Sequence, residues 1–194
     1  MNWEIFWDKK IREIAEKSDV ILDVGGGRKF QKGMKKYEIL FKNKKYLNMD
    51  MVAEYKPDIL GDIKSIPLDD NSVDAIICKA VLEHIDDPFK AVAEMYRVLR
   101  PGGVCLVSLP FIYPYHASKG YYGDYFRFTK EGVRFMFNRF SQMEIVNIRG
   151  LAGTIINFFP IKTARKILLG MAKVIDAVII SENQVSGFNV FLKK

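Results

Sequence analysis

Residues 20–27 read Val-Ile-Leu-Asp-Val-Gly-Gly-Gly, an apolar run that ends in three glycines. Short runs of β-branched and apolar side chains are typical of buried strands in a parallel sheet. Glycines allow a tight turn out of the strand and let a ligand approach the backbone closely, although a glycine turn by itself can also be only a turn. The stretch therefore predicts the first strand of an open α/β sheet, followed by a turn suited to a ligand.

Short apolar runs alternate with segments of helical periodicity on both sides of this strand, which is typical of a doubly wound α/β fold with a mostly parallel sheet. Further strands are expected at residues 46–50, 58–62, 73–78 and 104–109, and a last antiparallel pair at 143–148 and 187–192. Helices are expected at residues 3–17, 34–41, 88–99 and 129–139. With no internal repeat or low-complexity linker, residues 1–194 are expected to form one domain with a helical insertion near 155–180.

The composition is that of an ordinary globular protein. Hydrophobic residues make up 49% of the 194 residues and charged residues 27%, which excludes a disordered tail, a fibrous repeat and a disulfide-stapled mini-protein. Cys78 and Cys105 are too few for a disulfide framework and lie in apolar runs, so buried reduced thiols are expected. The N-terminus shows no secretory signal pattern, and the chain is therefore expected to be cytoplasmic.

Asp50 ends the second expected strand, where its carboxylate can accept hydrogen bonds from both hydroxyls of a ribose. Together with the glycine turn it predicts a site for a nucleotide-type cofactor. Phe30 stands where a nicotinamide-binding turn needs a small residue, and the chain has no phosphate-binding loop of the Gly-x-x-x-x-Gly-Lys-Ser/Thr type. A cofactor with a pyrophosphate is therefore disfavoured.

Several motifs follow in order along the chain. They are Gly61-Asp62-Ile63, Pro67-Leu68-Asp69-Asp70-Asn71-Ser72-Val73-Asp74, Val81-Leu82-Glu83-His84 and Arg97-Val98-Leu99-Arg100-Pro101-Gly102-Gly103. With the glycine turn, this series resembles the class I S-adenosylmethionine (SAM)-dependent methyltransferases of the type 11 group, from residue 20 to about residue 109 and more weakly beyond. The resemblance implies a seven-stranded sheet of order 3-2-1-4-5-7-6, SAM as cofactor, and methyl transfer as the reaction.

The resemblance also implies roles for single residues in binding the cofactor. Asp23, Gly25 and Gly27 would line its methionine end, Asp50 would hold the ribose with Met51 against the adenine, Asp62 and the Ile63 N–H would bond the adenine, and Cys78 and Lys79 would border the sulfonium. Lys29 stands where the family usually has a further glycine, so we expect Arg28 or Lys29 to neutralise the methionine carboxylate. No metal is expected, because a sulfonium is already a good leaving group and alignment supplies much of the catalysis.

Glu83-His84 has two interpretations: a general base or substrate contact, or a turn between a strand and the following helix. We favour a structural or cofactor-side role, because the same dipeptide marks family members with unrelated substrates.

The segment at residues 110–129 is rich in tyrosine and ends in Asp-Tyr-Phe-Arg-Phe-Thr, a motif that resembles one subset of the same family. It follows the fifth strand, where open α/β sheets carry ligand-contacting loops. In one interpretation it covers the acceptor, with His116, Tyr113 and Arg127 as acceptor-side catalytic candidates. In the other, Asp124 and Arg127 form an ion pair that fixes the loop and the aromatic residues are core. Both can hold together.

Residues 160–180 predict an amphipathic helix. Its polar side carries Lys162, Arg165, Lys166, Lys173 and Asp176, and its opposite side is apolar. The apolar side is expected to pack on the sheet or on a second subunit. Alternatively, the helix lies at an anionic membrane surface and presents a lipid-linked acceptor, which would make the protein membrane-peripheral.

The predicted function is methyl transfer from SAM to a small-molecule or lipid- or sugar-linked acceptor. One alternative is a non-catalytic SAM-binding protein that docks a partner. Another is an RNA methyltransferase, supported only by the net charge of +7. Residues 78–81 read Cys-Lys-Ala-Val and not the Asn/Asp-Pro-Pro-Tyr/Phe motif that resembles base-amino methylation, so a nucleic-acid target is disfavoured. The oligomeric state does not follow from the sequence.

Overall fold

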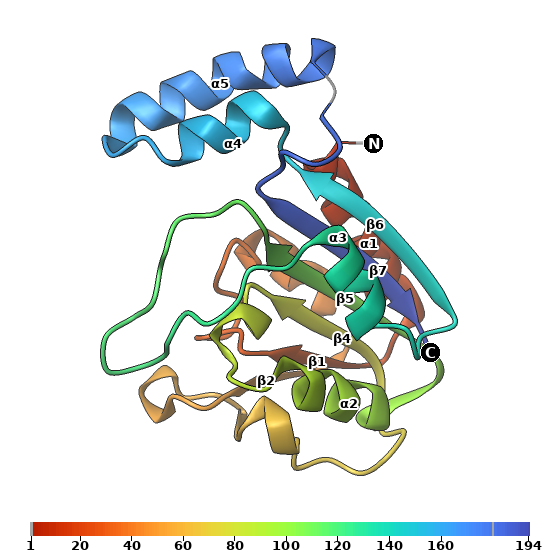
Figure 1. Ribbon diagram of the computed structural model, residues 1–194. Coiled ribbons are helices and arrows are strands. Elements are labelled where there is room, and N and C mark those ends of the chain that lie inside the picture. Colours follow the sequence, from red (N-terminus) through yellow and green to blue (C-terminus); the bar gives the residue numbers. More distant parts are fainter. Residues whose placement is uncertain (1, 180) are drawn as a thin grey trace.

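A seven-stranded sheet of order β3-β2-β1-β4-β5-β7-β6 forms the centre of the molecule, as predicted. The computed structural model describes residues 2–179 and 181–194, without the side chains of residues 162 and 166. The strands are β1 (Val20–Val24), β2 (Lys45–Asp50), β3 (Ile59–Leu60), β4 (Val73–Lys79), β5 (Leu99–Pro110), β6 (Gln142–Ile148) and β7 (Gly187–Lys193). The first five are parallel, and β7 runs antiparallel to both β5 and β6 (Figure 1).

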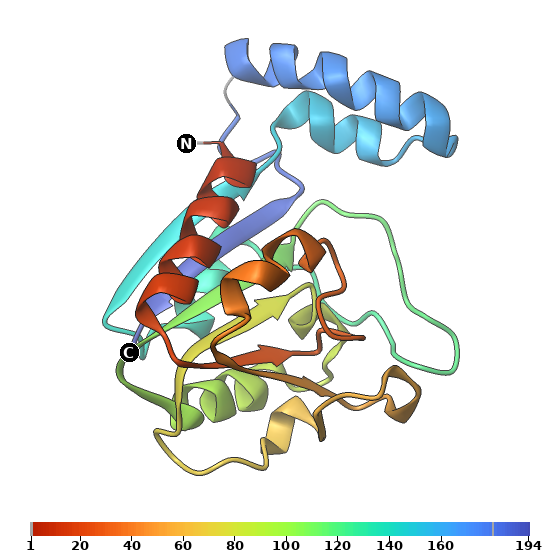
Figure 2. The ribbon, with the colours of Figure 1, turned by 180° about the vertical axis from the view of Figure 1, so that it is seen from behind.

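Helices cover both faces of the sheet, as expected for a doubly wound fold. On one face lie α1 (Trp3–Lys17) and the 3-10 helix η1 (Lys35–Phe41), and on the other lie α2 (Pro88–Val98) and α3 (Lys130–Met136) (Figures 1 and 2). Successive strand residues alternate between the two cores: Ile21 packs with α1 and η1, whereas Leu22 packs with α2 and α3. Cys78 and Cys105 are free and buried, and burial raises the pKa of both thiols.

The helix ends follow the signals in the sequence. The Asp87 carboxylate accepts a hydrogen bond from the Lys90 N–H, with Pro88 at the first helical position of α2. The Thr129 hydroxyl accepts one from the Gly132 N–H at the start of α3. Three short 3-10 helices, η2 (Ala53–Tyr55), η3 (Ile63–Ser65) and η4 (Leu82–His84), lie in the connections that follow β2, β3 and β4.

The expected insertion consists of two helices, α4 (Leu151–Asn157) and α5 (Lys162–Val178), that pack on each other beyond the end of the sheet (Figures 1 and 2). The expectation that the apolar side of α5 packs on the sheet is wrong. Its apolar residues Ile167, Met171, Val174 and Val178 are exposed, Val178 to 80%, and among its described side chains only Ala172 is buried.

The polar side of α5 faces the protein instead, because its side chains provide partners for backbone N–H groups of α4 and for an acidic side chain of α1. The Asp176 carboxylate accepts hydrogen bonds from the N–H groups of Gly150, Ala152 and Gly153 at the start of α4, at 2.8–3.1 Å. Lys173 forms an ion pair with Glu4 of α1 at 2.8 Å. Of the predicted basic side chains, those of Lys162 and Lys166 lie outside the described part of the structure.

None of the helices among the described residues combines the length and apolar character that crossing a membrane requires.

Candidate active site

The glycine turn after β1 begins with a backbone conformation that other residues rarely adopt. Gly25 has φ +62°, and a Cβ atom there would lie 2.6 Å from Cγ1 of Val81, the residue that follows β4 closely. Its N–H donates to the carbonyl of Met49 in β2 at 2.7 Å. The turn therefore lies directly against the ends of both neighbouring strands, which explains why glycine is required.

Asp50 holds this turn in place from the end of β2. Its Oδ2 accepts a hydrogen bond from the Gly27 N–H at 2.9 Å, and its Oδ1 accepts one from the Val52 N–H at 3.0 Å. The side chain is buried yet reaches the wall of a cavity. A carboxylate has about four acceptor positions, so Asp50 retains capacity for a diol while it fixes the turn. This second role did not follow from the sequence.

A cavity of about 300 Å³ lies over the ends of β1, β2 and β4. Many of the predicted cofactor residues line it, namely Gly25, Asp50, Met51, Asp62 and Ile63. Lys32, Tyr55, Val81, His84 and Tyr122 complete its wall from loops that the sequence did not connect with the cofactor. Its apolar surface with a few converging polar groups is typical of a small-molecule site.

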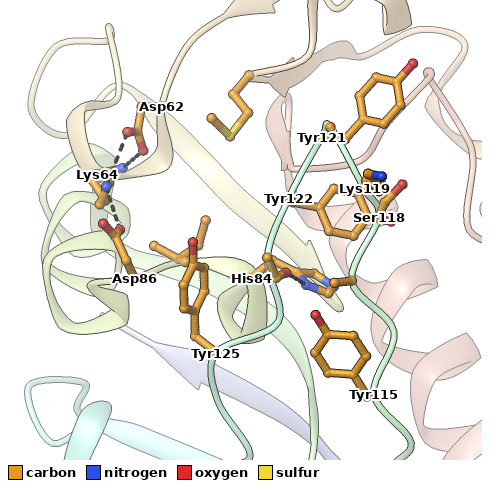
Figure 3. Close-up of a pocket in the computed structure, with 15 residues that line it drawn as sticks. Asp62, Lys64, His84, Asp86, Tyr115, Ser118, Lys119, Tyr121, Tyr122 and Tyr125 are labelled. Atoms are coloured by element: carbon orange, nitrogen blue, oxygen red, sulfur yellow. Dashed lines mark hydrogen bonds and ion pairs between the residues drawn. The ribbon is translucent and has the colours of Figure 1, made fainter.

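Asp62 is placed by its own backbone. Its Oδ1 accepts a hydrogen bond from the Lys64 N–H at 2.8 Å and so caps η3, while Lys64 Nζ contacts both Asp62 and Asp86 (Figure 3). Both Asp62 and Ile63 belong to the wall of the cavity.

Cys78 and Lys79 are not among the residues that line this cavity, and their expected place beside the sulfonium stays a prediction. Consecutive residues of a strand point to opposite faces, so neither of these two directs its side chain out of the strand end. Cys78 lies in the core with α2, and Lys79 places Nζ 4.9 Å from the centre of the Trp7 ring of α1.

Lys32 is the basic residue at the cavity, where Arg28 or Lys29 was expected. Its Nζ donates to the backbone carbonyls of Gly25, Lys79 and Ala80 at 2.9–3.1 Å. Lys32 has φ +51°, a strained backbone conformation for a residue other than glycine, and such strain is common at functional sites. Lys29 instead forms an ion pair with Asp58 at 2.8 Å. The three carbonyls form a binding site for an ammonium group that no motif predicted.

Asp23 lies beneath the turn, outside the residues that line the cavity. Its carboxylate accepts a hydrogen bond from the Tyr46 hydroxyl at 2.6 Å, and burial raises its pKa to about 6. A carboxyl whose pKa is higher in the folded state contributes stability at low pH that is lost as pH rises from about 4 to about 6.

Asp23→Asn is therefore expected to remove this pH dependence while keeping an acceptor for Tyr46. Between pH 4 and pH 7, the free energy of unfolding of the wild type should lose about 2 kcal/mol relative to that of the variant. Urea unfolding of both proteins across this range measures the difference. A constant difference between them at all pH values would show that Asp23 ionises normally.

A second cavity, of about 650 Å³, is walled by the aromatic segment that follows β5. Tyr115, Tyr122 and Tyr125 surround His84 there (Figure 3). The two cavities share wall residues, namely Met51, Asp62, His84, Ile85 and Tyr122. A cofactor in the first cavity and an acceptor in the second would therefore be neighbours.

Arg127 and Asp124 form the ion pair that one interpretation of this segment predicted. The guanidinium bonds both oxygens of the fully buried Asp124 carboxylate, at 2.5 and 2.7 Å, and also the carbonyls of Tyr113 and Pro114. It also holds the pKa of Asp124 down, at about 2. Because its donors point into the segment, Arg127 acts here as a positioning residue.

His116 is fixed by the same ion pair and turned toward Glu83. Its N–H donates to Asp124 at 2.8 Å, and its Nε2 lies 3.5 Å from Oε1 of Glu83. The predicted catalytic candidate Tyr113 is exposed and packs the edge of its ring against His116. Neither His116 nor Tyr113 lines the two cavities described above.

Glu83 combines the two interpretations of the Glu83-His84 dipeptide. It lies in the turn of η4, and its backbone carbonyl accepts hydrogen bonds from the N–H groups of Tyr125 and Phe126. Its side chain is only 1% exposed and faces His116. The turn is structural, but it places a buried carboxylate next to His84, which lies in the wall of the second cavity.

Comparisons with known proteins agree with this geometry. Residues 22–107 match a family model described as "Methyltransferase domain". Over 50 residues the chain is 50% identical to a probable S-adenosylmethionine-dependent methyltransferase of Mycolicibacterium smegmatis, a match that covers 26% of this chain and 20% of the relative.

Solved structures share the fold over nearly the whole chain. A SAM-dependent methyltransferase from Archaeoglobus fulgidus has a TM-score of 0.58 and 12% identity, with full coverage of both chains. The phosphoethanolamine N-methyltransferase 2 of Haemonchus contortus, in complex with S-adenosyl-L-methionine, has a TM-score of 0.55 and 16% identity, and covers 95% of this chain and 52% of that one.

Residues 22–107 are therefore similar to a methyltransferase domain, and the whole chain has the fold of solved SAM-dependent methyltransferases. The chain spans less than a quarter of the length of curated relatives such as the Mycolicibacterium smegmatis protein.

Proposed function

We propose that the protein transfers the methyl group of SAM to a small-molecule or lipid- or sugar-linked acceptor in the cavity beneath the aromatic segment. The observation that supports this most is the shared wall of the two cavities at His84 and Tyr122. The cavity over β1, β2 and β4 has the expected cofactor residues, and the neighbouring one has room and aromatic walls for a second molecule.

The groups around the smaller cavity fit SAM. Asp50 has acceptor positions left for the ribose hydroxyls, and Asp62 and Ile63 flank the position proposed for the adenine. The carbonyls of Gly25, Lys79 and Ala80 suit the α-ammonium of the methionine end. Lys32 would then leave these carbonyls and neutralise the neighbouring carboxylate, the role expected of Arg28 or Lys29.

Bound SAM supplies a methyl group on a sulfonium, which is open to in-line displacement. The work left to the chain is to align the acceptor and to exclude water. In this proposal the tyrosines of the aromatic segment form the acceptor wall, and Arg127 holds that segment through Asp124. His116 and Tyr113 remain acceptor-side candidates, and their part is a prediction.

A screen with labelled SAM tests this function. Purified full-length protein is incubated with pools of small metabolites, lipids and glycans, and S-adenosylhomocysteine and labelled product are measured. Transfer to a small-molecule, lipid or sugar acceptor is the expected result. SAM binding without S-adenosylhomocysteine in any pool would favour a non-catalytic SAM-binding protein, and labelling confined to RNA would favour the RNA methyltransferase.

The exposed side of α5 supports contact with a membrane that carries a lipid-linked acceptor. Ile167, Met171, Val174 and Val178 form an apolar row on a helix that stands away from the sheet (Figure 1). Helices that lie on membranes bury such a row at the boundary of headgroups and acyl chains. RNA would instead require basic side chains at this surface.

Val174→Glu combined with Val178→Glu is expected to reduce binding to anionic vesicles at least about 10-fold, because two charges would enter the apolar boundary. Co-sedimentation with vesicles of anionic and of neutral lipids measures this, with Ile39→Glu, a change at an exposed isoleucine of η1, as the matched control. Wild-type protein that binds no vesicles but forms dimers, dissociated by the double change, would identify the row as a subunit contact.

A further inference from the structure

Three side chains with metal-binding atoms meet at the acceptor side of the site. They are Glu83 and His84 of η4 and His116 of the aromatic segment, and one ligand atom from each lies within 4.8 Å of the others. Oε1 of Glu83 is 3.5 Å from Nε2 of His116 and 3.9 Å from Nε2 of His84. The two segments lie more than 30 residues apart in the sequence, so the tertiary fold creates the cluster.

Backbone carbonyls fix the orientation of both imidazoles. Nδ1 of His84 lies 2.6 Å from the carbonyl of Gly123, and Nδ1 of His116 lies 3.0 Å from the carbonyl of Pro114. A carbonyl oxygen only accepts hydrogen bonds, so Nδ1 carries the hydrogen in both rings. In the neutral rings both Nε2 atoms then present lone pairs toward Glu83. The same arrangement, with Nδ1 bonded to a carbonyl, orients histidines that bind metals.

The carboxylate is incompletely satisfied by the protein. Glu83 is 1% exposed, and its Oε2 has no hydrogen-bond partner among the described residues. If His116 carried a proton on Nε2, the distance of 3.5 Å from Nε2 to Oε1 would exceed the roughly 2.8 Å of a charge-assisted hydrogen bond. Such a proton would also give no partner to Oε2 of Glu83 or to Nε2 of His84. A buried acceptor without a partner is costly, so a cation that contacts all three side chains would satisfy the cluster better than a proton on His116.

A divalent ion matches the spacing of these atoms. Nitrogen and oxygen ligands lie about 2.0–2.2 Å from zinc, so neighbouring ligand atoms in a tetrahedral site are about 3.4 Å apart. The observed 3.5 and 3.9 Å lie within about 0.5 Å of this value, and the remaining pair of ligand atoms lies within 4.8 Å. Two imidazoles and one carboxylate suit Zn²⁺ and the other divalent transition metals, and leave positions open for a further ligand.

We propose that Glu83, His84 and His116 bind one divalent transition-metal ion beside the acceptor cavity. His84 belongs to the wall of that cavity, so an oxygen donor of the acceptor is the further ligand that fits this place (Figure 3). Only this last point rests on the proposed function. Methyl displacement from a sulfonium needs no metal, and the ion's contribution is to hold the acceptor and lower the pKa of its hydroxyl.

Metal binding by the full-length protein tests the site without SAM or any acceptor. Chelator-treated protein is titrated with Zn²⁺ and with Co²⁺ by calorimetry and absorption spectroscopy. We expect one equivalent to bind with a Kd in the micromolar range or below, and the Co²⁺ spectrum to show nitrogen and oxygen ligands without thiolate. The chain contains only these two histidines, so no other histidine site competes.

His116→Ala and Glu83→Gln are expected to weaken Zn²⁺ binding at least about 30-fold, and Asp86→Asn, a change at an exposed neighbouring acid, to leave it unchanged. Because Glu83 is buried, the rise in melting temperature with Zn²⁺ is compared in His116→Ala as a second measurement. Binding only above millimolar concentration, or equal binding by His116→Ala, would overturn the proposal. So would NMR resonances of His116 as an imidazolium at pH 7 that Zn²⁺ does not perturb. Loss of methylation alone bears on the proposed function and not on the ion.

Discussion

Asp50→Ala is expected to weaken SAM binding about 10- to 100-fold. Charge-assisted hydrogen bonds contribute about 1.5–3 kcal/mol, and the variant would lose those to the ribose. The same change would remove the acceptor from the N–H groups of Gly27 and Val52, so the glycine turn would lose its tie to β2. Both effects lower affinity, because the turn forms the other wall of the cavity.

Calorimetry with SAM measures this loss, and Asp50→Asn separates its two parts. Asparagine keeps one acceptor oxygen and the side-chain volume but loses the charge. It should therefore retain more of the hydrogen bonding to the glycine turn than of the hydrogen bonding to the ribose. Asp69→Ala, at an exposed acid, is the control. Unchanged affinity in a folded Asp50→Ala protein would remove Asp50 from the cofactor site.

Arg127→Ala is expected to have the largest effect on the aromatic segment. It would leave the buried Asp124 carboxylate without its counter-ion, and breaking a buried pair from one side costs about 3–5 kcal/mol. It would also release the carbonyls of Tyr113 and Pro114. The segment should loosen while the strands and the cavity over β1 and β2 remain formed.

Hydrogen exchange of the Tyr125, Phe126 and Phe128 amides reports this loosening, because they bond the carbonyls of Glu83 and Pro110. Their exchange should accelerate about 100-fold, with the amides of β4 as reference, while SAM affinity falls less than about 3-fold, well below the effect of Asp50→Ala.

The double variant with Asp124→Ala tests whether Arg127 acts through Asp124. It should be more stable than Arg127→Ala, because it no longer buries an unpaired charge. Equal loss of SAM affinity and of amide protection in Arg127→Ala would instead place Arg127 in the cofactor site.

Much of the fold follows from local properties of the sequence. The sheet order that the structure confirms is implied by the resemblance of the motif series to class I methyltransferases. The apolar run before Gly25 predicts a buried strand, and Asp87-Pro88 predicts the start of α2. These features depend on neighbours in the chain, such as caps, turns and alternating side chains. For the same reason Asp50 could be placed at the ligand-binding end of its strand, whereas Asp62 and Ile63 are assigned to the site by the family resemblance.

Only the tertiary structure determined the contacts between segments that are distant in the sequence. Lys32 reaches the carbonyls of Lys79 and Ala80 through the fold. Glu83 meets His116 because the aromatic segment folds back over η4, where the Tyr125 N–H bonds the Glu83 carbonyl. Periodicity predicted that α5 has a polar and an apolar side but not which one faces the protein. That choice depends on Asp176 and Lys173 finding partners on α4 and α1, and such partners exist only after the chain has folded.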